Sequence, residues 1–269
     1  MGEKRFPNDH LLVSTEWLAG HLTDGDLRLV EVTPPGSGYI LGHLPGAVYL
    51  NLDEVFTGRV NNVPYLVGPV DEVAAVLGRL GLVLDKQVVV YDEIGGPRAA
   101  QAFWLLEYLG FERVCVLEGG IEGWMAEGRP TTRRPPTVEP TTFTPAVRAD
   151  QLATAEWIVS RLEADTVCLL DCRTLEEYSE GHIPGAHNRP WDRTLRRRAY
   201  QAFREASELK PELAELGATK DKEIVTYCVT GARSAHTYLT LRLLGYSRVR
   251  NYEGSWAEWG ARADLPKAS

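Results

Sequence analysis

Residues 224–236 carry the most informative pattern in this chain and read Ile224-Val225-Thr226-Tyr227-Cys228-Val229-Thr230-Gly231-Ala232-Arg233-Ser234-Ala235-His236. An apolar, β-branched run ends at Cys228, a short loop follows, and apolar residues then recur at helical spacing from Ser234 onward. Cys228 would therefore face backbone N–H groups and the positive end of a helix dipole, with Arg233 adding a formal charge. All three favour a thiolate. We interpret Cys228 as a nucleophile, because a cysteine that merely fills a core needs no loop with Gly231 and Arg233.

The two halves of the sequence resemble each other over most of their length. Three segments of the first half recur in the second in the same order, about 135 to 140 residues further on. Gly42-His43-Leu44-Pro45-Gly46-Ala47 recurs as Gly181-His182-Ile183-Pro184-Gly185-Ala186. Val88-Val89-Val90-Tyr91 recurs as Ile224-Val225-Thr226-Tyr227, and Glu118-Gly119-Gly120 recurs as Glu253-Gly254-Ser255. An internal repeat of this size indicates two related domains in one chain. The length of 269 residues also suits two domains.

We expect the first domain to span residues 1–130 and the second residues 146–269. Residues 131–145 between them contain four prolines and no apolar periodicity, which is typical of an extended, semi-rigid linker. In each half, short β-branched runs alternate with helical patterns, for example a helix over 71–80 and a strand over 87–91. Such alternation predicts an α/β fold, with a parallel sheet and helices on both faces in each domain.

The repeat also provides an internal control for the cysteine loop. Aligned on the preceding tyrosine, Cys228 falls opposite Asp92, and the loop after Asp92 is one residue longer and includes Pro97. An aspartate has no thiol to accept and pass on a sulfur atom, and a proline removes one N–H from any anion-binding loop. We predict that the first domain is catalytically inactive, walls the cleft and stabilises the second domain.

The composition narrows the possible partners. The net charge of −8 argues against a general binder of nucleic acid or of anionic membranes. No run approaches the roughly 18 apolar residues of a membrane span, and the start has no apolar segment, so we expect no membrane association and a cytoplasmic location. The four cysteines form neither a disulfide framework nor a close zinc-binding pair, so we expect no metal.

The doubled Gly-His-x-Pro-Gly-Ala motif, the loop from Cys228 to Arg233 and the closing segment from Tyr252 to Trp259 together resemble tandem-domain rhodaneses, the thiosulfate and 3-mercaptopyruvate sulfurtransferases. The resemblance extends from about Leu12 to Gly260, and several motifs agree in order and spacing. It implies two rhodanese domains, each built around a five-stranded parallel sheet, with only the second one active. That implication agrees with the silent Asp92 loop.

The resemblance also implies the reaction. The Cys228 thiolate takes the outer sulfur of a small anionic donor and becomes a persulfide, and a thiophilic acceptor, cyanide or a thiol, then removes that sulfur. This is covalent catalysis in two half-reactions, without metal or organic cofactor. The chain is expected to be a monomer or a weak homo-oligomer. The expected donor-binding residues are those of the loop, together with one arginine from the cationic segment upstream: Val229, Thr230, Gly231, Ala232, Arg233, Ser234 and Arg189.

Two other functional classes are disfavoured. Phosphatases of the cell-cycle dual-specificity type that share this fold have a longer loop between cysteine and arginine, whereas four residues separate Cys228 from Arg233 here. A tighter loop suits a sulfane sulfur, so a phosphatase or arsenate reductase is less favoured. A non-catalytic sulfur-carrier or binding module would be favoured only if the nucleophile were missing.

The donor is harder to assign. Mercaptopyruvate-specific relatives resemble Cys-Gly-Ser-Gly-Val in the loop, and vertebrate thiosulfate enzymes carry two cations directly after the cysteine. This chain has neither, because Val229 and Thr230 are neutral and the cation comes late, as Arg233. An arginine at that end resembles bacterial thiosulfate sulfurtransferases and favours thiosulfate, with 3-mercaptopyruvate as the alternative. Its planar fork can hold a sulfonate in a bidentate manner.

Several further residues admit a structural or a functional interpretation. For His43 and His182 a role in the turn is favoured, because both halves keep the histidine. For Arg173 we favour pairing with Asp171 over substrate contact, and His236 is expected to pack rather than act as a base. Trp256 is the aromatic residue expected to wall the pocket. The arginine-rich segment from Arg189 to Arg204 is expected to be either a solvated face or a region that steers the donor.

Overall fold

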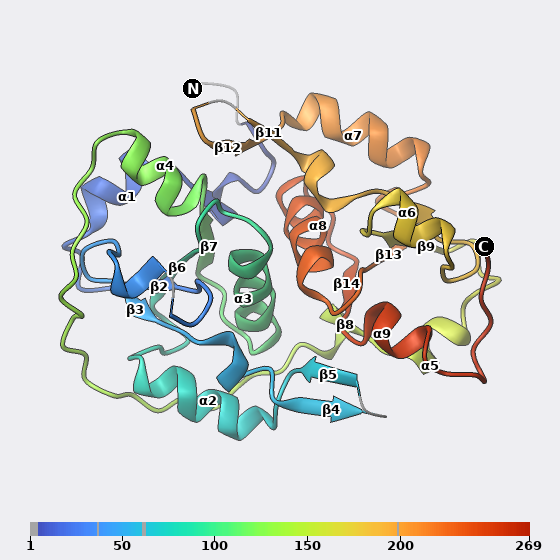
Figure 1. Ribbon diagram of the computed structural model, residues 1–269, viewed down its shortest axis with the longest axis horizontal. Coiled ribbons are helices and arrows are strands. Elements are labelled where there is room, and N and C mark those ends of the chain that lie inside the picture. Colours follow the sequence, from blue (N-terminus) through green and yellow to red (C-terminus); the bar gives the residue numbers. More distant parts are fainter. Residues whose placement is uncertain (1–4, 37, 61–62, 198) are drawn as a thin grey trace.

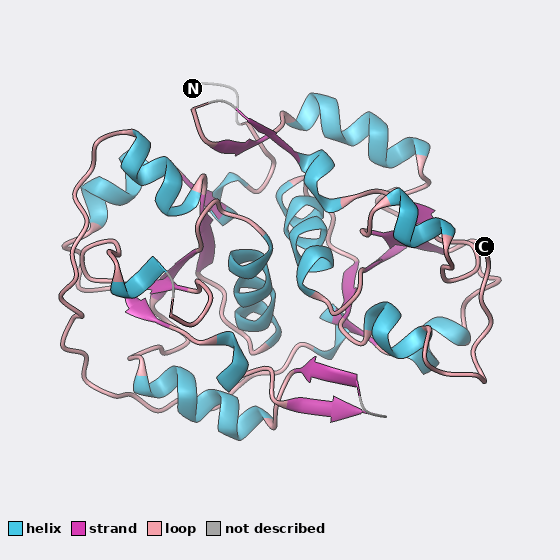
Figure 2. Ribbon diagram, viewed as in Figure 1, coloured by secondary structure: helices cyan, strands magenta, loops and turns pink. Residues whose placement is uncertain are grey.

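The computed structural model describes residues 5–36, 38–60, 63–197 and 199–269 of the chain. Within these ranges the chain forms two parallel sheets of five strands each, and helices cover both faces of each sheet (Figures 1 and 2). The α/β class and the five-stranded parallel sheets that the sequence predicts are confirmed. No helix in the described ranges is long and apolar enough to cross a membrane.

The sheet of the first half has the strand order β1-β7-β6-β2-β3. Its strands are β1 (Leu12–Val13), β2 (Leu27–Glu31), β3 (Val48–Tyr49), β6 (Gln87–Tyr91) and β7 (Val114–Leu117). The helices of this half are α1 (Thr15–His21), α2 (Val70–Arg79), α3 (Pro97–Tyr108) and α4 (Gly120–Ala126), and an antiparallel hairpin joins β4 (Gly58–Val60) to β5 (Val63–Leu66). Strand β6 is the middle strand and is buried from Val88 to Tyr91. Because helices cover both faces of the sheet, the sequence of β6 is a continuous apolar run.

The second half repeats this plan with the strand order β10-β9-β13-β14-β8. Its strands are β8 (Leu152–Ala153), β9 (Val167–Asp171), β10 (His187–Asn188), β13 (Glu223–Tyr227) and β14 (Val249–Tyr252). Its helices are α5 (Ala155–Val159), α6 (Leu175–Ser179), α7 (Ala206–Glu215), α8 (Ala232–Leu243) and α9 (Ser255–Trp259), and β11 (Leu195–Arg197) pairs with β12 (Gln201–Phe203) in a hairpin. The middle strand β13 leads into α8 as β6 leads into α3.

The two halves meet along α3 and α8, which lie side by side at the centre of the molecule (Figure 1). One apolar cluster runs through both halves and includes Phe103 of α3 and Leu241 of α8. A polar contact lies within it, because the Tyr238 hydroxyl donates a hydrogen bond to Glu107 at 2.8 Å and Arg242 donates to the same carboxylate at 3.1 Å. This packing holds the N-termini of both helices, and hence the two loops that precede them, against the domain interface.

Residues 131–145 form neither helix nor strand and run along the outside of the first half (Figure 1). They are attached at intervals, for example by the Thr141 N–H, which donates to the Gly78 carbonyl at 2.8 Å, and by a bridge between Thr132 and His43. The segment expected to be a linker thus has neither helix nor strand in the structure.

Candidate active site

Cys228 follows β13 directly and is 1% exposed. Its N–H donates to the Ser255 hydroxyl at 3.1 Å, and its carbonyl accepts from the Trp256 N–H at 3.0 Å. Ser255 in turn donates to the Tyr252 carbonyl at 2.7 Å. The closing segment that the sequence repeat singled out therefore supports the backbone on which the cysteine sits.

The loop after Cys228 presents free hydrogen-bond donors. For the backbone N–H groups of residues 229–234, no acceptor is found within the described part of the chain. Gly231 has a φ of +85°, and an added Cβ would lie 3.2 Å from the Glu253 carbonyl oxygen, so the tight turn into α8 requires a glycine. The result is a nest of N–H groups at the start of a twelve-residue helix, an arrangement suited to an anion.

Arg233 lies beside the cysteine and is held by a carboxylate that sequence analysis missed. Its two terminal nitrogens donate to the two carboxylate oxygens of Glu177 at 2.8 and 2.9 Å. The pKa of Arg233 is raised, first by Glu177 and further by the negative charge that Cys228 acquires as a thiolate. The same pair lowers the pKa of Glu177 to about 2. The guanidinium thus stays charged next to the sulfur while its orientation is fixed.

The sequence did contain a signal for Glu177. Thr174 and Glu177 form a capping box at the start of α6, a pattern with its own sequence signature. The Glu177 carboxylate accepts from the Thr174 N–H at 2.9 Å as well as from Arg233. The capping box indicates where the helix starts. It does not indicate that this end of the helix contacts the Cys228 loop, because that contact depends on tertiary structure.

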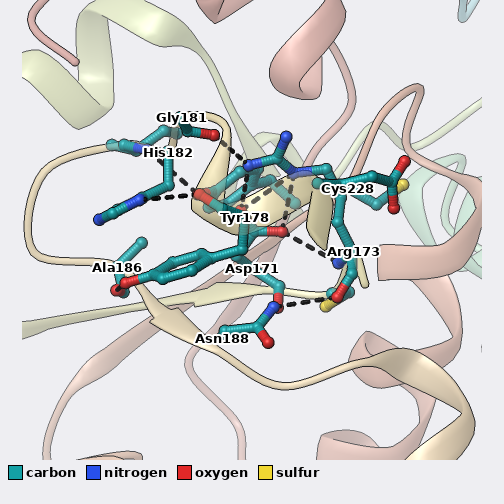
Figure 3. Close-up of polar contacts among 12 residues, drawn as sticks. Asp171, Arg173, Tyr178, Gly181, His182, Ala186, Asn188 and Cys228 are labelled. Carbon is teal, nitrogen blue, oxygen red and sulfur yellow. Dashed lines mark hydrogen bonds and ion pairs between the residues drawn. The ribbon is translucent and has the colours of Figure 1, made fainter. Parts of the chain in front are cut away.

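Asp171 and Arg173 form a buried ion pair at the end of β9 (Figure 3). Arg173 donates to Asp171 at 2.6 Å and to the Gly181 carbonyl at 2.6 Å. Its guanidinium carbon lies 4.6 Å from the centre of the Trp256 ring. The structural pairing that we favoured for Arg173 is confirmed. Trp256, which was expected to wall the pocket, packs on this pair and is not among the residues that line the cavity between the two halves.

The equivalent loop of the first half holds an anion of its own. The Asp92 carboxylate, 2% exposed, accepts from the N–H groups of Ile94 at 3.0 Å, Gly96 at 2.8 Å and Ala99 at 3.1 Å. The aspartate side chain therefore fills, in the first half, the position that a bound anion would take in the second.

A cavity of about 600 Å³ lies between the two loops. Its walls include Thr230 and Ala232 from the second half and Asp92, Arg98 and further residues from the first half. The first half thus walls the cleft in front of the Cys228 loop, as predicted.

Arg189 is not brought to this cleft. It is 1% exposed, donates to the Thr194 hydroxyl at 3.0 Å and does not line the cavity. His236 is also buried, stacks on Phe203 with 5.0 Å between ring centres, and has its pKa lowered to about 3 by burial and by Arg189. Both side chains lie inside the second domain, and His236 is a neutral packing residue as expected.

The two motif histidines have the same surroundings in both halves. His43 stacks on Tyr39 and His182 stacks on Tyr178, each with 3.8 Å between ring centres (Figure 3 for His182). In each pair one ring nitrogen of the histidine lies within hydrogen-bond distance of the tyrosine carbonyl. An arrangement that both halves share supports the turn role predicted for them.

The arginine-rich segment is largely neutralised by acids. Arg196 is paired with Glu205 and Glu208, Arg197 with Glu122 at 3.0 Å. Arg204 is paired with Glu212 at 2.6 Å. Arg198, which also belongs to the segment, lies outside the described residues. Of the two interpretations offered, these contacts favour a solvated, ion-paired face.

Burial keeps the remaining cysteines protonated. It raises the pKa of Cys115 to about 12 and that of Cys168 to about 11, and it raises the pKa of Cys172 further still. Since the thiolate is the nucleophile, these three thiols are unreactive at neutral pH.

A family model described as a rhodanese-like domain matches the sequence twice, at residues 14–127 and 154–262. The chain belongs to the rhodanese family. A thiosulfate sulfurtransferase of Azotobacter vinelandii is 35% identical over 264 residues, covering 95% of this chain and 96% of that protein. A sulfur carrier protein of Thermus thermophilus is 34% identical and covers 98% of both chains.

A relative named for another donor is also similar. A 3-mercaptopyruvate sulfurtransferase of Escherichia coli is 28% identical over 94% of this chain and 96% of its own length. The crystal structure of SseA from Escherichia coli, described as a 3-mercaptopyruvate sulfotransferase with the rhodanese fold, superimposes with a TM-score of 0.82 at 26% identity, covering 91% of this chain and 98% of that one. This rhodanese is therefore a sulfurtransferase.

Proposed function

We propose that this rhodanese transfers the outer sulfur of thiosulfate to a thiophilic acceptor, such as cyanide or a thiol, through a persulfide on Cys228. The observation that carries the proposal is the contrast between the two loops. The same fold element binds its own carboxylate at Asp92, whereas at Cys228 the N–H groups of residues 229–234 have no acceptor in the described chain. A nest of free donors around a thiol is suited to an anionic sulfur species.

The first half-reaction begins with the Cys228 thiolate attacking the outer sulfur of the donor. The bond between the two thiosulfate sulfurs breaks, and its electron pair leaves with sulfite. The persulfide that remains on Cys228 carries negative charge on its outer sulfur, which the free N–H groups and the N-terminus of α8 stabilise. In the second half-reaction the acceptor attacks that outer sulfur and the electron pair returns to Cys228, which completes a ping-pong cycle.

Arg233 binds the donor in this proposal, because its guanidinium lies beside Cys228 and attracts the sulfonate end of the donor. Glu177 reduces the net charge that the donor meets but keeps the guanidinium in one orientation, since both terminal nitrogens are bound. Val229, Thr230, Gly231, Ala232 and Ser234 contribute backbone donors.

Thiosulfate is proposed as the donor because a relative named for it, that of Azotobacter vinelandii, is 35% identical, whereas the Escherichia coli relative named for 3-mercaptopyruvate is 28% identical. Arg233, at the end of the loop, also favours thiosulfate, because bacterial thiosulfate sulfurtransferases have an arginine at this end. The second candidate is 3-mercaptopyruvate, which the similarity to the SseA structure keeps open. The ratio of kcat/KM for the two donors, measured with one acceptor, distinguishes them.

The persulfide itself is tested with thiosulfate labelled in its outer sulfur. After mixing and desalting, the wild-type protein is expected to retain one labelled sulfur atom on the peptide that contains Cys228, and added cyanide is expected to release it as thiocyanate. Label that stays with the Cys228→Ser variant would place the sulfur on another residue and reject the mechanism.

A further inference from the structure

A glutamate follows an equivalent strand in each half and accepts a hydrogen bond from a hairpin of the other half. Glu118 follows β7 and accepts from the Phe203 N–H at 2.9 Å, at the end of the β11–β12 hairpin. Glu253 follows β14 and accepts from the Val67 N–H at 2.7 Å, directly after the β4–β5 hairpin. The two hairpins lie at the top and at the bottom of Figure 1. The surroundings of Glu118 are therefore a direct comparison for those of Glu253.

Glu118 has a cation from its own chain. One terminal nitrogen of Arg5 donates to both oxygens of the Glu118 carboxylate, at 2.9 and 2.7 Å, and the other donates to the Phe203 carbonyl. The Arg5 guanidinium carbon lies 5.0 Å from the centre of the Phe6 ring, and Phe6 is buried in the apolar core. An arginine followed by an apolar residue thus completes the site in the first half.

Glu253 lacks such a cation. It is 6% exposed, and among the described residues no arginine or lysine forms an ion pair with it. Burial raises the pKa of Glu253 to about 8, and the hydrogen bond from the Val67 N–H only partly offsets this. A nearly buried carboxylate without a counterion is costly in free energy, so a cation that reached Glu253 would stabilise its charged form.

A cavity of about 530 Å³ lies beside Glu253 and gives a cation room to bind. Its volume falls in the range typical of ligand sites. Apolar side chains from both halves form part of its wall, among them Leu66, Pro69 and Leu152. It lies outside the carboxyl ends of β8 and β14, a position at which open α/β sheets bind ligands.

The other charged residues of this cavity do not neutralise Glu253. Glu156 and Glu258 also line the cavity, and both are paired with Arg262, at 2.5 and 3.5 Å. Arg59 lines it as well, but its side chain is exposed and no ion pair with Glu253 is found for it in the described chain. Within that part of the chain, Glu253 is thus the glutamate of the wall that is left without a cation.

We propose that the cavity beside Glu253 binds a guanidinium group on an apolar stem, carried either by the arginine of a partner peptide or by a small free guanidine. The guanidinium pairs with the Glu253 carboxylate as that of Arg5 pairs with Glu118, and the stem packs on the apolar wall. A guanidinium suits the position because it is weakly hydrated and stays charged when buried. The inference goes beyond the proposed function and does not depend on it, because this cavity is separate from the one in front of the Cys228 loop.

The first test is isothermal titration calorimetry of the full-length protein at pH 8.5, where the Glu253 carboxylate is largely charged. The probes are N-acetyl-Arg-Phe-amide, which copies the N-terminal arrangement of the first half, and agmatine, a free guanidine. One site per chain is expected. Glu253→Gln keeps an oxygen for the Val67 N–H and should weaken binding by about tenfold or more.

The controls separate the charge of Glu253 from the shape of the cavity. Glu156→Gln is the matched variant, because Glu156 lines the same cavity but is exposed and already paired with Arg262. It should change the affinity by less than about twofold. The dipeptide with citrulline in place of arginine is neutral and should bind about tenfold more weakly or not at all.

The two probes also distinguish the sources of the guanidinium. Tighter binding of the dipeptide supports a peptide partner, and tighter binding of agmatine supports a free guanidine. Equal affinities for wild type and Glu253→Gln would overturn the inference, as would the absence of binding of both probes at millimolar concentration.

The first half provides a second, independent test. Arg5→Ala removes the built-in cation, and it should raise the number of agmatine sites per chain from one to two by freeing Glu118. Adding Glu118→Gln to that variant should return the number to one. A single site in Arg5→Ala would show that an external guanidinium does not replace Arg5, which would overturn the comparison that carries the inference.

Discussion

The loops after β6 and β13 are two versions of one element that differ in what occupies the anion position. In the first, the Asp92 carboxylate accepts three backbone hydrogen bonds and the loop is complete. In the second, Cys228 leaves the corresponding donors free. The same nest of N–H groups stabilises the fold when the anion is built in, and it can serve chemistry when the anion must come from outside. The following variants test this contrast, in order of decreasing expected effect.

The largest effect is expected from moving the thiol between the loops. Cys228→Ser should reduce sulfur transfer to background, because a hydroxyl is not ionised at neutral pH. Adding Asp92→Cys to that variant should restore no activity, since Pro97 removes one donor and the loop is one residue longer. Turnover with thiosulfate and cyanide measures both. Recovery of activity in the double variant would show that the two loops are chemically equivalent.

The cation beside the cysteine comes next. Arg233→Ala should raise the KM for thiosulfate by about tenfold or more, as expected for the loss of a charge-assisted contact. Glu177→Gln should act in the opposite direction and lower the KM severalfold at low salt, because it frees the Arg233 charge. Steady-state kinetics with thiosulfate at two ionic strengths provides the measurement. Equal KM values in both variants and wild type would remove Arg233 from the donor site.

Asp92 should matter for stability rather than for turnover. Asp92→Ala leaves three backbone donors without their acceptor, and a loss of about 1–3 kcal/mol in the free energy of unfolding is expected. Asp53→Ala, an exposed acid of the same cavity, is the control and should cost little. Urea unfolding curves decide the outcome. An unchanged midpoint in Asp92→Ala would mean that the hydrogen bonds of this loop are replaced by water at no cost.

The Glu177–Arg233 pair gives a smaller, pH-dependent effect. The folded-state pKa of Glu177 is lowered from 4.5 to about 2, so its contribution to stability is present above about pH 4.5 and is lost as the pH falls toward 2. The difference in unfolding free energy between wild type and Glu177→Gln should therefore shrink over that interval. A difference that stays constant between pH 6 and pH 2 would contradict the lowered pKa.

The smallest effect is expected from the arginine-rich segment. Reversing the charges of Arg196 and Arg197 should change the rate of persulfide formation by less than about twofold at physiological salt, because both arginines already have acidic partners. Stopped-flow measurement at low and high salt tests this. A large decrease in the rate of persulfide formation that occurs only at low salt would instead support electrostatic steering of the donor by this segment.

Much of the fold follows from local patterns. The internal repeat and the β-branched runs predict two parallel sheets. The predicted helix over 71–80 and strand over 87–91 agree with α2 and β6 to within about a residue at their ends. Cys228, the loop glycine and Asp92 at the equivalent position of the first half are also visible in the sequence, because strand, loop and helix are adjacent along the chain. Local order is enough to predict them.

Other features depend on contacts between distant segments. Arg189 was expected to bind the donor, yet it is buried and donates to the Thr194 hydroxyl. Glu177 looks like an ordinary capping residue until α6 is placed against the active loop.

The sequence by itself thus determined the repeat and the sheet of each half, and it singled out Cys228 as the proposed nucleophile, because these depend on neighbouring residues and on comparison of the chain with itself. Tertiary structure decided which charge is available to the sulfur and what faces it across the cleft. Those properties depend on side chains that meet from segments far apart in the sequence, where burial and pairing change the free energy of a charge by more than any local pattern records.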